Sequence, residues 1–273
     1  MSSKRSENTY QKINTIFMRD AKNVIMPYDP FTEAEFEYLR GLKWRGEEKI
    51  DGTNIRLEVV KQPVYGGELS LIQGVEFTVA YKGKTDNAQT PKPLLDFLMT
   101  NYPEEKILEA LGLSKVIMES EFAEHKWETY DDIPEKYTIY GEGYGKGIQK
   151  AGPHYIKDGV GFIVFDVKVN EVWLTTEARD EIAEKLGAPI VPLMGYFTLD
   201  EAIEYVRKGF TSTIAEDKEF IAEGLVLRTD LGLLNRRGKR LIVKVKYEDF
   251  QKYRNVYGTD EKVIQPVNEK YSK

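Results

Sequence analysis

The sequence EEKIDGTNIRL runs from Glu47 to Leu57 and places Lys49 two residues before an Asp-Gly pair. An acid precedes this lysine, and Asn54 and Arg56 follow the Asp-Gly pair. Asp-Gly favours a turn, and the apolar and polar residues of NIRLEVV (54–60) alternate, which predicts a half-buried strand. Lys49 therefore stands at a turn that leads into a strand. It is either an ordinary surface charge or a nucleophile.

The composition is that of a water-soluble globular protein. The chain has 273 residues, of which 41% are hydrophobic and 31% are charged. No apolar run approaches the ~20 residues of a membrane helix, and the N-terminus lacks the apolar segment of a secretory signal. The absence of cysteine excludes disulfides and thiol catalysis, and two histidines argue against a histidine triad or metal cluster. We expect one cytoplasmic domain over residues 1–273 that contacts no membrane.

The charge distribution is uneven. The formal net charge is -6, from 39 Lys and Arg against 45 Asp and Glu, which argues against a protein that coats nucleic acid nonspecifically. Residues 235–254 nevertheless contain eight basic and two acidic side chains. This segment is either a solvated face or a surface that binds a phosphate backbone or a triphosphate.

The pattern of expected elements is α+β with mainly antiparallel sheets, because the strands are joined by short turns and the helices do not alternate strictly with them. Thr32 and Glu35 fit a capping box at the start of the first helix. Strands are expected at 54–60, 75–81, 115–122, 137–143, 161–170, 223–229 and 240–247. Helices are expected at 33–40, 93–102, 104–113, 176–187 and 199–209.

The last expected strand carries two lysines on one face. With a period of two residues, Lys244 and Lys246 share a face with Ile242, while Val243 and Val245 point the other way. Two neighbouring lysines repel each other, so this face opens either on water or on an anion.

The segment YGEGYGKGIQK (140–150) has four glycines at alternate positions. It matches neither the P-loop nor the G-x-G-x-x-G pattern, so a tight turn with a bulge explains the glycines most simply. Glu142 lies within this cluster. Glycines on both sides would let a ligand approach the backbone while the carboxylate accepts ribose hydroxyls.

Five segments in this order resemble motifs of the covalent nucleotidyltransferases, the superfamily of ATP-dependent ligases and messenger-RNA capping enzymes. They are Lys-x-Asp-Gly-x-Asn at 49–54, then YGEGYG, FIVFDVKV, EGLVLR and LIVKVK, which resemble motifs I, III, IIIa, IV and V. At position 54 the chain resembles the RNA ligase 2-like branch, which carries Asn there, whereas DNA ligases and capping enzymes usually carry Arg. The resemblance reaches from near the N-terminus to about residue 250. It implies a nucleotidyltransferase core, similar to the ATP-grasp fold.

The resemblance also implies roles for the residues of motif I. Lys49 matches the lysine that attacks the α-phosphorus of ATP and becomes lysyl-AMP. Glu48 matches a residue that lines the adenine pocket. Asp51 and Asn54 match positions that orient the lysine and the phosphate or the water molecules of its metal ion.

The other motifs imply the rest of the site. Glu142 matches the carboxylate near the ribose, and Phe165 matches the aromatic ring that stacks on adenine, with Asp166 beside it. By pattern alone Phe165 fits the core equally well. Glu223 matches an acid that helps to hold the metal, and Lys244 and Lys246 match the pair that contacts the phosphates.

One position departs from the family pattern. Lys82, in AYKGKT, stands where the family usually has an arginine that contacts phosphate, and Lys84 could be the true counterpart. Lysine supplies the charge without the two-pronged hydrogen bonding of arginine.

The residues implied by the resemblance also suit the chemistry. A lysine nucleophile must be neutral, whereas an unperturbed lysine has a pKa of ~10.4, so reaching ~7.5 requires roughly 4 kcal/mol. Nearby cations favour the neutral form. Mg²⁺ (or Mn²⁺) bound by Asp51, Glu142 and Glu223 would add such a cation and would offset the negative charge of the acids.

These inferences predict an ATP-dependent RNA ligase. AMP would pass from ATP to Lys49 and then to a 5′-phosphate end, and a 3′-hydroxyl would seal the RNA, as a nicked duplex or as single strands. The alternatives are a DNA nick ligase, a capping-type guanylyltransferase, and a non-catalytic nucleotide- or RNA-binding module. Only 27 residues follow Lys246, so we expect no appended OB or helical C-terminal domain and consider an accessory protein in its place.

Overall fold

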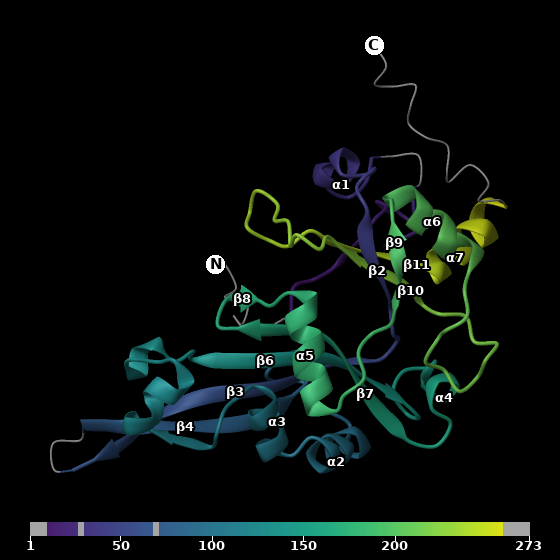
Figure 1. Cartoon of the computed structure of the whole chain (residues 1–273). Helices are drawn as coiled ribbons and strands as arrows, with labels where there is room; N and C mark the ends of the chain where they lie inside the picture. The colour runs from purple at the N-terminus through teal and green to yellow at the C-terminus, as the bar shows by residue number, and fades with distance from the viewer. Residues whose placement is uncertain (1–9, 27–29, 68–70, 259–273) are drawn as a thin grey trace. The chain divides into compact units, whose positions relative to one another are not determined.

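The structure is a computed structural model, and it describes residues 10–26, 30–67 and 71–258. Its contacts divide the chain into two compact units (Figure 1). Unit 1 comprises Met1–Tyr10 and Asp51–Ile190, and unit 2 comprises Gln11–Ile50 and Val191–Lys273. The chain passes from unit 2 to unit 1 directly after Lys49 and Ile50. No helix in the described ranges has the length and apolar character needed to cross a membrane.

Unit 1 is built on a six-stranded antiparallel sheet with the strand order β5-β4-β3-β6-β7-β8. Its strands are β3 (Thr53–Gly66), β4 (Leu71–Lys82), β5 (Val116–Met118), β6 (Lys136–Gly145), β7 (Val160–Val169) and β8 (Val172–Trp173). Its helices are α2 (Lys92–Asn101), α3 (Glu104–Ala110), α4 (Gly152–Tyr155), α5 (Thr176–Leu186) and the 3-10 helices η1 (Glu119–His125) and η2 (Tyr130–Asp132).

The two faces of this sheet differ in character. Along β3, Ile55, Leu57 and Val59 are buried in one hydrophobic core with residues of α2, α3 and α5. Because side chains alternate along a strand, Asn54, Arg56 and Glu58 lie on the opposite face. Unit 1 therefore has an apolar face covered by helices and a polar face.

Unit 2 is built on a five-stranded sheet with the order β1-β11-β10-β2-β9. Its strands are β1 (Asn14–Thr15), β2 (Trp44–Glu48), β9 (Leu193–Phe197), β10 (Gly224–Arg228) and β11 (Ile242–Lys246). Its helices are α1 (Ala34–Tyr38), α6 (Leu199–Lys208) and α7 (Tyr247–Tyr257). β1 pairs with β11 in parallel, and the other pairs are antiparallel.

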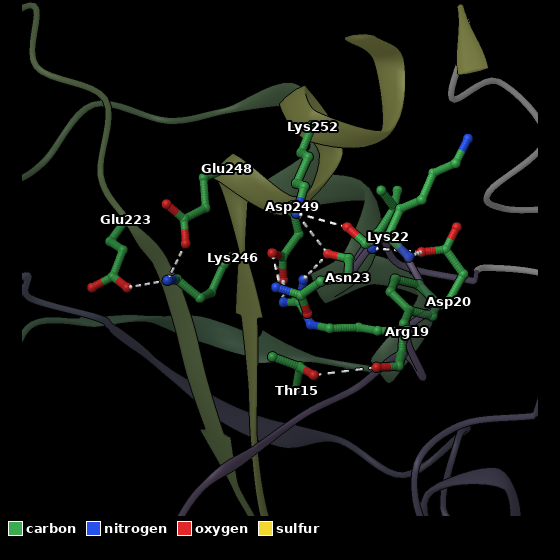
Figure 2. A network of polar contacts seen from close by, with 12 residues as sticks. Thr15, Arg19, Asp20, Lys22, Asn23, Glu223, Lys246, Glu248, Asp249 and Lys252 are labelled. Carbon is green, nitrogen blue, oxygen red and sulfur yellow. Dashed lines mark hydrogen bonds and ion pairs between the residues drawn. The ribbon is translucent and has the colours of Figure 1, made fainter. Parts of the chain in front are cut away.

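The core of unit 2 lies on one face of this sheet. Trp44, Leu225, Leu227, Val243 and Val245 are buried together with residues of α6 and α7. The N-terminal segment contributes Ile16 and Phe17 to this core. It also contacts α7 through an ion pair, in which Arg19 Nη2 donates to both carboxylate oxygens of Asp249 at 2.7 Å (Figure 2).

The α+β class with mainly antiparallel sheets is confirmed, and so is the pairing of the last two expected strands as β10 and β11. The capping box is wrong: the N-cap of α1 is Glu33, and the Thr32 hydroxyl donates instead to the Thr15 carbonyl at 2.8 Å. The strand expected at 115–122 ends at Met118, where η1 begins. That residues 1–273 act as one nucleotidyltransferase domain stays a prediction.

Candidate functional site

Lys49 lies at the end of β2, where its main chain and side chain both contact the start of β10. The Lys49 amide donates to the Gly224 carbonyl at 2.9 Å. Its ammonium Nζ donates to Glu223 Oε2 at 2.6 Å, and the side chains are 23% and 14% exposed. Sheet pairing thus brings residues 174 positions apart into a largely buried ion pair.

Lys246, at the end of β11, contacts the same carboxylate. Its Nζ lies 3.0 Å from Glu223 Oε1 and also contacts Glu248, and Figure 2 shows it between the two acids. The register explains this, because Gly224 pairs with Lys246. Burial opposes the charge of Lys246, but hydrogen bonds and attraction from Glu248 and Glu223 outweigh it and raise the pKa of this lysine.

Lys244 lies on the same face of β11, as the pattern of alternation predicted, with Val243 and Val245 buried on the other face. It forms no ion pair within residues 10–26, 30–67 and 71–258. Burial, followed by repulsion from Lys49 and Lys246, lowers its pKa. Lys49, Lys244 and Lys246 thus carry three formal positive charges against the two negative charges of Glu223 and Glu248, and the excess of positive charge suits an anion such as phosphate.

The side chain of Glu48 is buried on the core face of β2 and is fully engaged. Its carboxylate accepts hydrogen bonds from Ser212 Oγ at 2.5 Å, Thr213 Oγ1 at 2.7 Å and the Thr213 amide at 3.0 Å. Sequence reasoning missed these two partners, and nothing in the spacing of residues 48 and 212 indicates that they meet.

In unit 1, the turn after Lys49 leads to a pair of polar side chains. Asn54 on β3 lies opposite Glu142 on β6 in the register of the sheet. Asn54 Oδ1 is buried and has no hydrogen-bond partner among the residues that the structure describes. A Cβ on Gly52 would lie 2.8 Å from the Glu142 Cγ, so glycine is needed for this close approach. Asp51 is held by its amide, which donates to the Tyr155 hydroxyl at 3.1 Å.

Phe165 lies among aromatic rings rather than in the hydrophobic core of unit 1. Its ring centroid is 5.1 Å from that of Tyr10 and 6.4 Å from that of Tyr140, and it remains partly exposed. A register shift between Tyr140 and Gly141 marks a bulge beside it. The neighbouring Asp166 is buried and accepts a hydrogen bond from the Tyr10 hydroxyl at 2.8 Å.

Lys82 takes part in a charge network on the polar face of unit 1. Glu58 is buried and accepts Lys82 at 2.9 Å, Lys136 at 2.8 Å and the buried Arg56 at 2.7 Å. These cations outweigh burial and lower the pKa of Glu58. Lys84 is exposed. Sequence reasoning did not single out Arg56 or Glu58, although their spacing of two residues on β3 places both on the face of Asn54.

The sequence matches the RNA ligase family over residues 42–246, which is more than half of the chain. This range includes Lys49 and ends at Lys246. The chain belongs to the RNA ligase family. No curated protein matches the chain in a sequence comparison.

Several solved structures of a Naegleria gruberi RNA ligase are similar to this RNA ligase family member. The structure with PPi has 15% sequence identity and a TM-score of 0.48, with 91% of this chain and 64% of that chain covered. A mutant with ATP and Mn has 15% identity and a TM-score of 0.47, with 81% and 54% covered. A mutant with AMP and Mn has 17% identity and a TM-score of 0.46, with 88% and 62% covered. The chain thus spans less than two thirds of the length of these relatives.

The predicted site residues of this RNA ligase family member fall into two sets. Unit 2 brings together the lysines and the acid at the strand ends, Lys49, Glu223, Lys244 and Lys246, and it also holds Glu48. Unit 1 pairs Asn54 with Glu142 and carries Asp51, Lys82 and Phe165. The roles assigned to these residues stay predictions.

The three residues predicted to bind the metal are divided between the units, with Asp51 and Glu142 in one and Glu223 in the other. Among the described residues, no three acidic, histidine or cysteine side chains form a group that could hold a metal. Mg²⁺ commonly keeps several waters and uses one or two carboxylates with substrate phosphates. Metal binding by Glu223 stays a prediction, and each of its oxygens already accepts an ammonium group.

Proposed function

We propose that the protein is an ATP-dependent RNA ligase whose Lys49 becomes covalently adenylylated. The observation that carries this proposal is the arrangement of Lys49, Glu223 and Lys246, in which one carboxylate bridges two ammonium groups at the ends of three neighbouring strands. An ordinary surface lysine such as Lys43 is exposed, whereas Lys49 hydrogen-bonds to the backbone of β10 and pairs with a largely buried acid.

The geometry supports a nucleophilic role for Lys49. Its Nζ would give up a proton and bond to the α-phosphorus of ATP, the bond from that phosphorus to the bridging oxygen would break, and pyrophosphate would leave. Glu223, at 2.6 Å, is within the distance at which a general base acts. Lys244 and Lys246 would stabilise the negative charge that develops on the phosphoryl oxygens.

A divalent cation beside Glu223 would screen its charge and support the departing pyrophosphate. Glu223 would then hold both that ion and Lys246. The ion pair with Lys49 would weaken, because the carboxylate would share its charge among more cations, and this favours release of the nucleophile.

The residues of unit 1 support recognition of the nucleoside. The buried and unpaired Asn54 Oδ1 needs a hydrogen-bond donor, since a buried polar atom without a partner costs about 1–3 kcal/mol. Glu142, opposite it in the sheet, would accept ribose hydroxyls. The partly exposed ring of Phe165 would stack on adenine.

In the later steps, AMP would pass from Lys49 to a 5′-phosphate end, forming a phosphoanhydride. A 3′-hydroxyl would then attack that 5′-phosphorus and release AMP. The substrate would be RNA ends, either in a nicked duplex or in single strands.

The test is covalent labelling with α-labelled ATP and Mg²⁺, read after denaturation. Wild type should retain the label, Lys49→Ala should lose it, and Lys43→Ala should keep it. Lys43 is a matched control because it precedes the same strand and also pairs with a glutamate at 2.6 Å, but it is exposed. Unlabelled wild type, or label that persists in Lys49→Ala, would refute the proposal. Label from GTP alone would indicate a capping-type enzyme instead.

A further inference from the structure

The connection between β10 and β11 is an ordered hairpin, Thr229–Leu241, rather than a loose loop. The Leu241 amide donates to the Leu233 carbonyl at 2.8 Å, and the Asn235 amide donates to the Lys239 carbonyl at 2.8 Å. At the tip, Asn235 Oδ1 accepts the amides of Arg237 at 2.9 Å and of Lys239 at 3.1 Å. Figure 1 shows this yellow-green hairpin as a narrow arm between the end of β10 and the start of β11.

The tip carries three cations that lack an acidic partner in the described part of the chain. Arg236, Arg237 and Lys239 are exposed, and none of them forms an ion pair with any residue that the structure describes. Several exposed lysines elsewhere do pair, as in Lys43–Glu201, Lys185–Glu181 and Lys208–Glu204. In a chain with a net charge of -6, unpaired positive charge gathered on a rigid turn indicates an anionic partner.

The hairpin continues from the end of β10 into the start of β11, and Glu223 and Lys246 lie at the opposite ends of these two strands. Lys246 lies seven positions after Lys239, and an extended strand rises ~3.3 Å per residue, so the tip lies within ~23 Å of the end of β11. At ~3.4 Å per phosphate along one strand of a duplex, this distance corresponds to roughly seven nucleotides.

We propose that the hairpin Thr229–Leu241 is an arm that binds the phosphate backbone of RNA, about seven nucleotides from the end that is joined. This inference rests on the proposed ligase function, which supplies the polyanionic substrate. Arginine and lysine at the tip contact phosphates without reading sequence. The Asn235 turn orders the backbone beforehand, so less conformational entropy is lost on binding. The arm thereby holds the duplex while Lys49, Glu223 and Lys246 carry out the chemistry.

The test is the triple variant Arg236→Ala, Arg237→Ala, Lys239→Ala. Its matched control is Lys43→Ala, Lys185→Ala, Lys208→Ala, which changes the net charge equally but removes lysines that are ion-paired. Affinity for a nicked RNA duplex is measured between 50 and 200 mM salt, together with AMP labelling from ATP. Each lost phosphate contact should reduce the slope of log K against log salt by about 1, or about 3 for the triple variant.

We expect the arm variant to bind RNA at least tenfold more weakly at low salt, with AMP labelling equal to wild type. The loss should be absent on duplexes that extend fewer than about seven base pairs from the nick. Unchanged RNA affinity, or an equal loss in the control variant, would overturn the inference. An unlabelled wild type whose RNA binding still depends on the arm would refute the ligase proposal and leave the arm as an RNA-binding element.

Discussion

Lys244 and Lys246 lie two residues apart on one face of β11, yet their replacement should change stability in opposite directions. Lys244→Met removes a half-buried charge that has no ion-pair partner in the described part of the chain and is repelled by Lys49 and Lys246. Lys246→Met removes contacts with two carboxylates, Glu223 and Glu248. Methionine keeps much of the hydrocarbon chain in both cases, so the comparison isolates the charge.

The magnitudes follow from the surroundings of each lysine. Relief of burial and repulsion at Lys244 should stabilise the fold by about 0.5–1 kcal/mol, within the range of optimised partly exposed charges. In the Lys246–Glu223 ion pair, the Lys246 side chain is 20% exposed and the Glu223 side chain is 14% exposed. This pair is therefore intermediate between surface and buried ion pairs. Their loss should cost about 1–3 kcal/mol. Both variants should lose AMP transfer.

The assay is urea unfolding followed by tryptophan fluorescence, repeated as the pH is raised toward the usual lysine pKa of 10.5. Lys244 has a lowered pKa in the fold, so its charged form destabilises at pH 7, and the advantage of Lys244→Met should shrink as the pH rises toward 10.5. Lys246 has a raised pKa, so its stabilisation is complete below 10.5 and is lost as the pH rises through its higher folded value. Equal destabilisation by both variants at pH 7 would refute this electrostatic account.

Three further changes test other parts of the structure, each by urea unfolding. Gly52→Ala should destabilise by about 1–3 kcal/mol through overpacking, because its Cβ would crowd Glu142 and the Gly143 carbonyl, whereas Gly41→Ala, with no atom within 4 Å of the added Cβ, should not. Glu58→Gln should cost about 3–5 kcal/mol, because buried Arg56 loses a charged partner. In wild type the pKa of Glu58 is lowered, so its carboxylate stabilises the fold at pH values above the usual pKa of 4.5, and this stability is lost as the pH falls below 4.5. Ser212→Ala should cost about 1–3 kcal/mol by removing a donor from the buried Glu48 carboxylate, and Thr213→Ser, which keeps its hydroxyl, should cost less.

The strands of unit 1 could be predicted because their alternation survives in the sequence. In NIRLEVV, the apolar residues Ile55, Leu57 and Val59 face the core and the polar ones face away, which is the pattern expected for a half-buried strand. The shared face of Lys244 and Lys246 was likewise confirmed, since Val243 and Val245 are buried on the opposite face of β11.

β2 could not be predicted, although Lys49 depends on it. Its sequence, WRGEE, buries Glu47 and Glu48 on opposite faces, so no alternation of apolar and polar residues is visible. Arg45 pairs with Glu47 locally, but the other partners that make this burial favourable, Arg228 for Glu47 and Ser212 with Thr213 for Glu48, are more than 160 positions away in the sequence. Tertiary pairing of this kind leaves no local signal.

Helix α7 was also missed, because it begins directly where β11 ends. Tyr247 was expected to close the strand, but its amide donates to the Glu223 carbonyl at 2.9 Å and the helix starts there. The charge network of Arg56, Glu58 and Lys82 was missed for a related reason. Arg56 and Glu58 lie on β3 but Lys82 lies on β4, and only the sheet register brings Lys82 to them.

The central claim is that the amine of Lys49 bonds to phosphorus, and peptide mapping after reaction with ATP and Mg²⁺ tests it most directly. An adenylylated Lys49 would resist trypsin, so the account predicts AMP on a single uncleaved peptide, Gly46–Arg56, in wild type. Adenylate on Lys43, Lys244 or Lys246 instead, or complete cleavage after Lys49 in protein that carries the label, would contradict it.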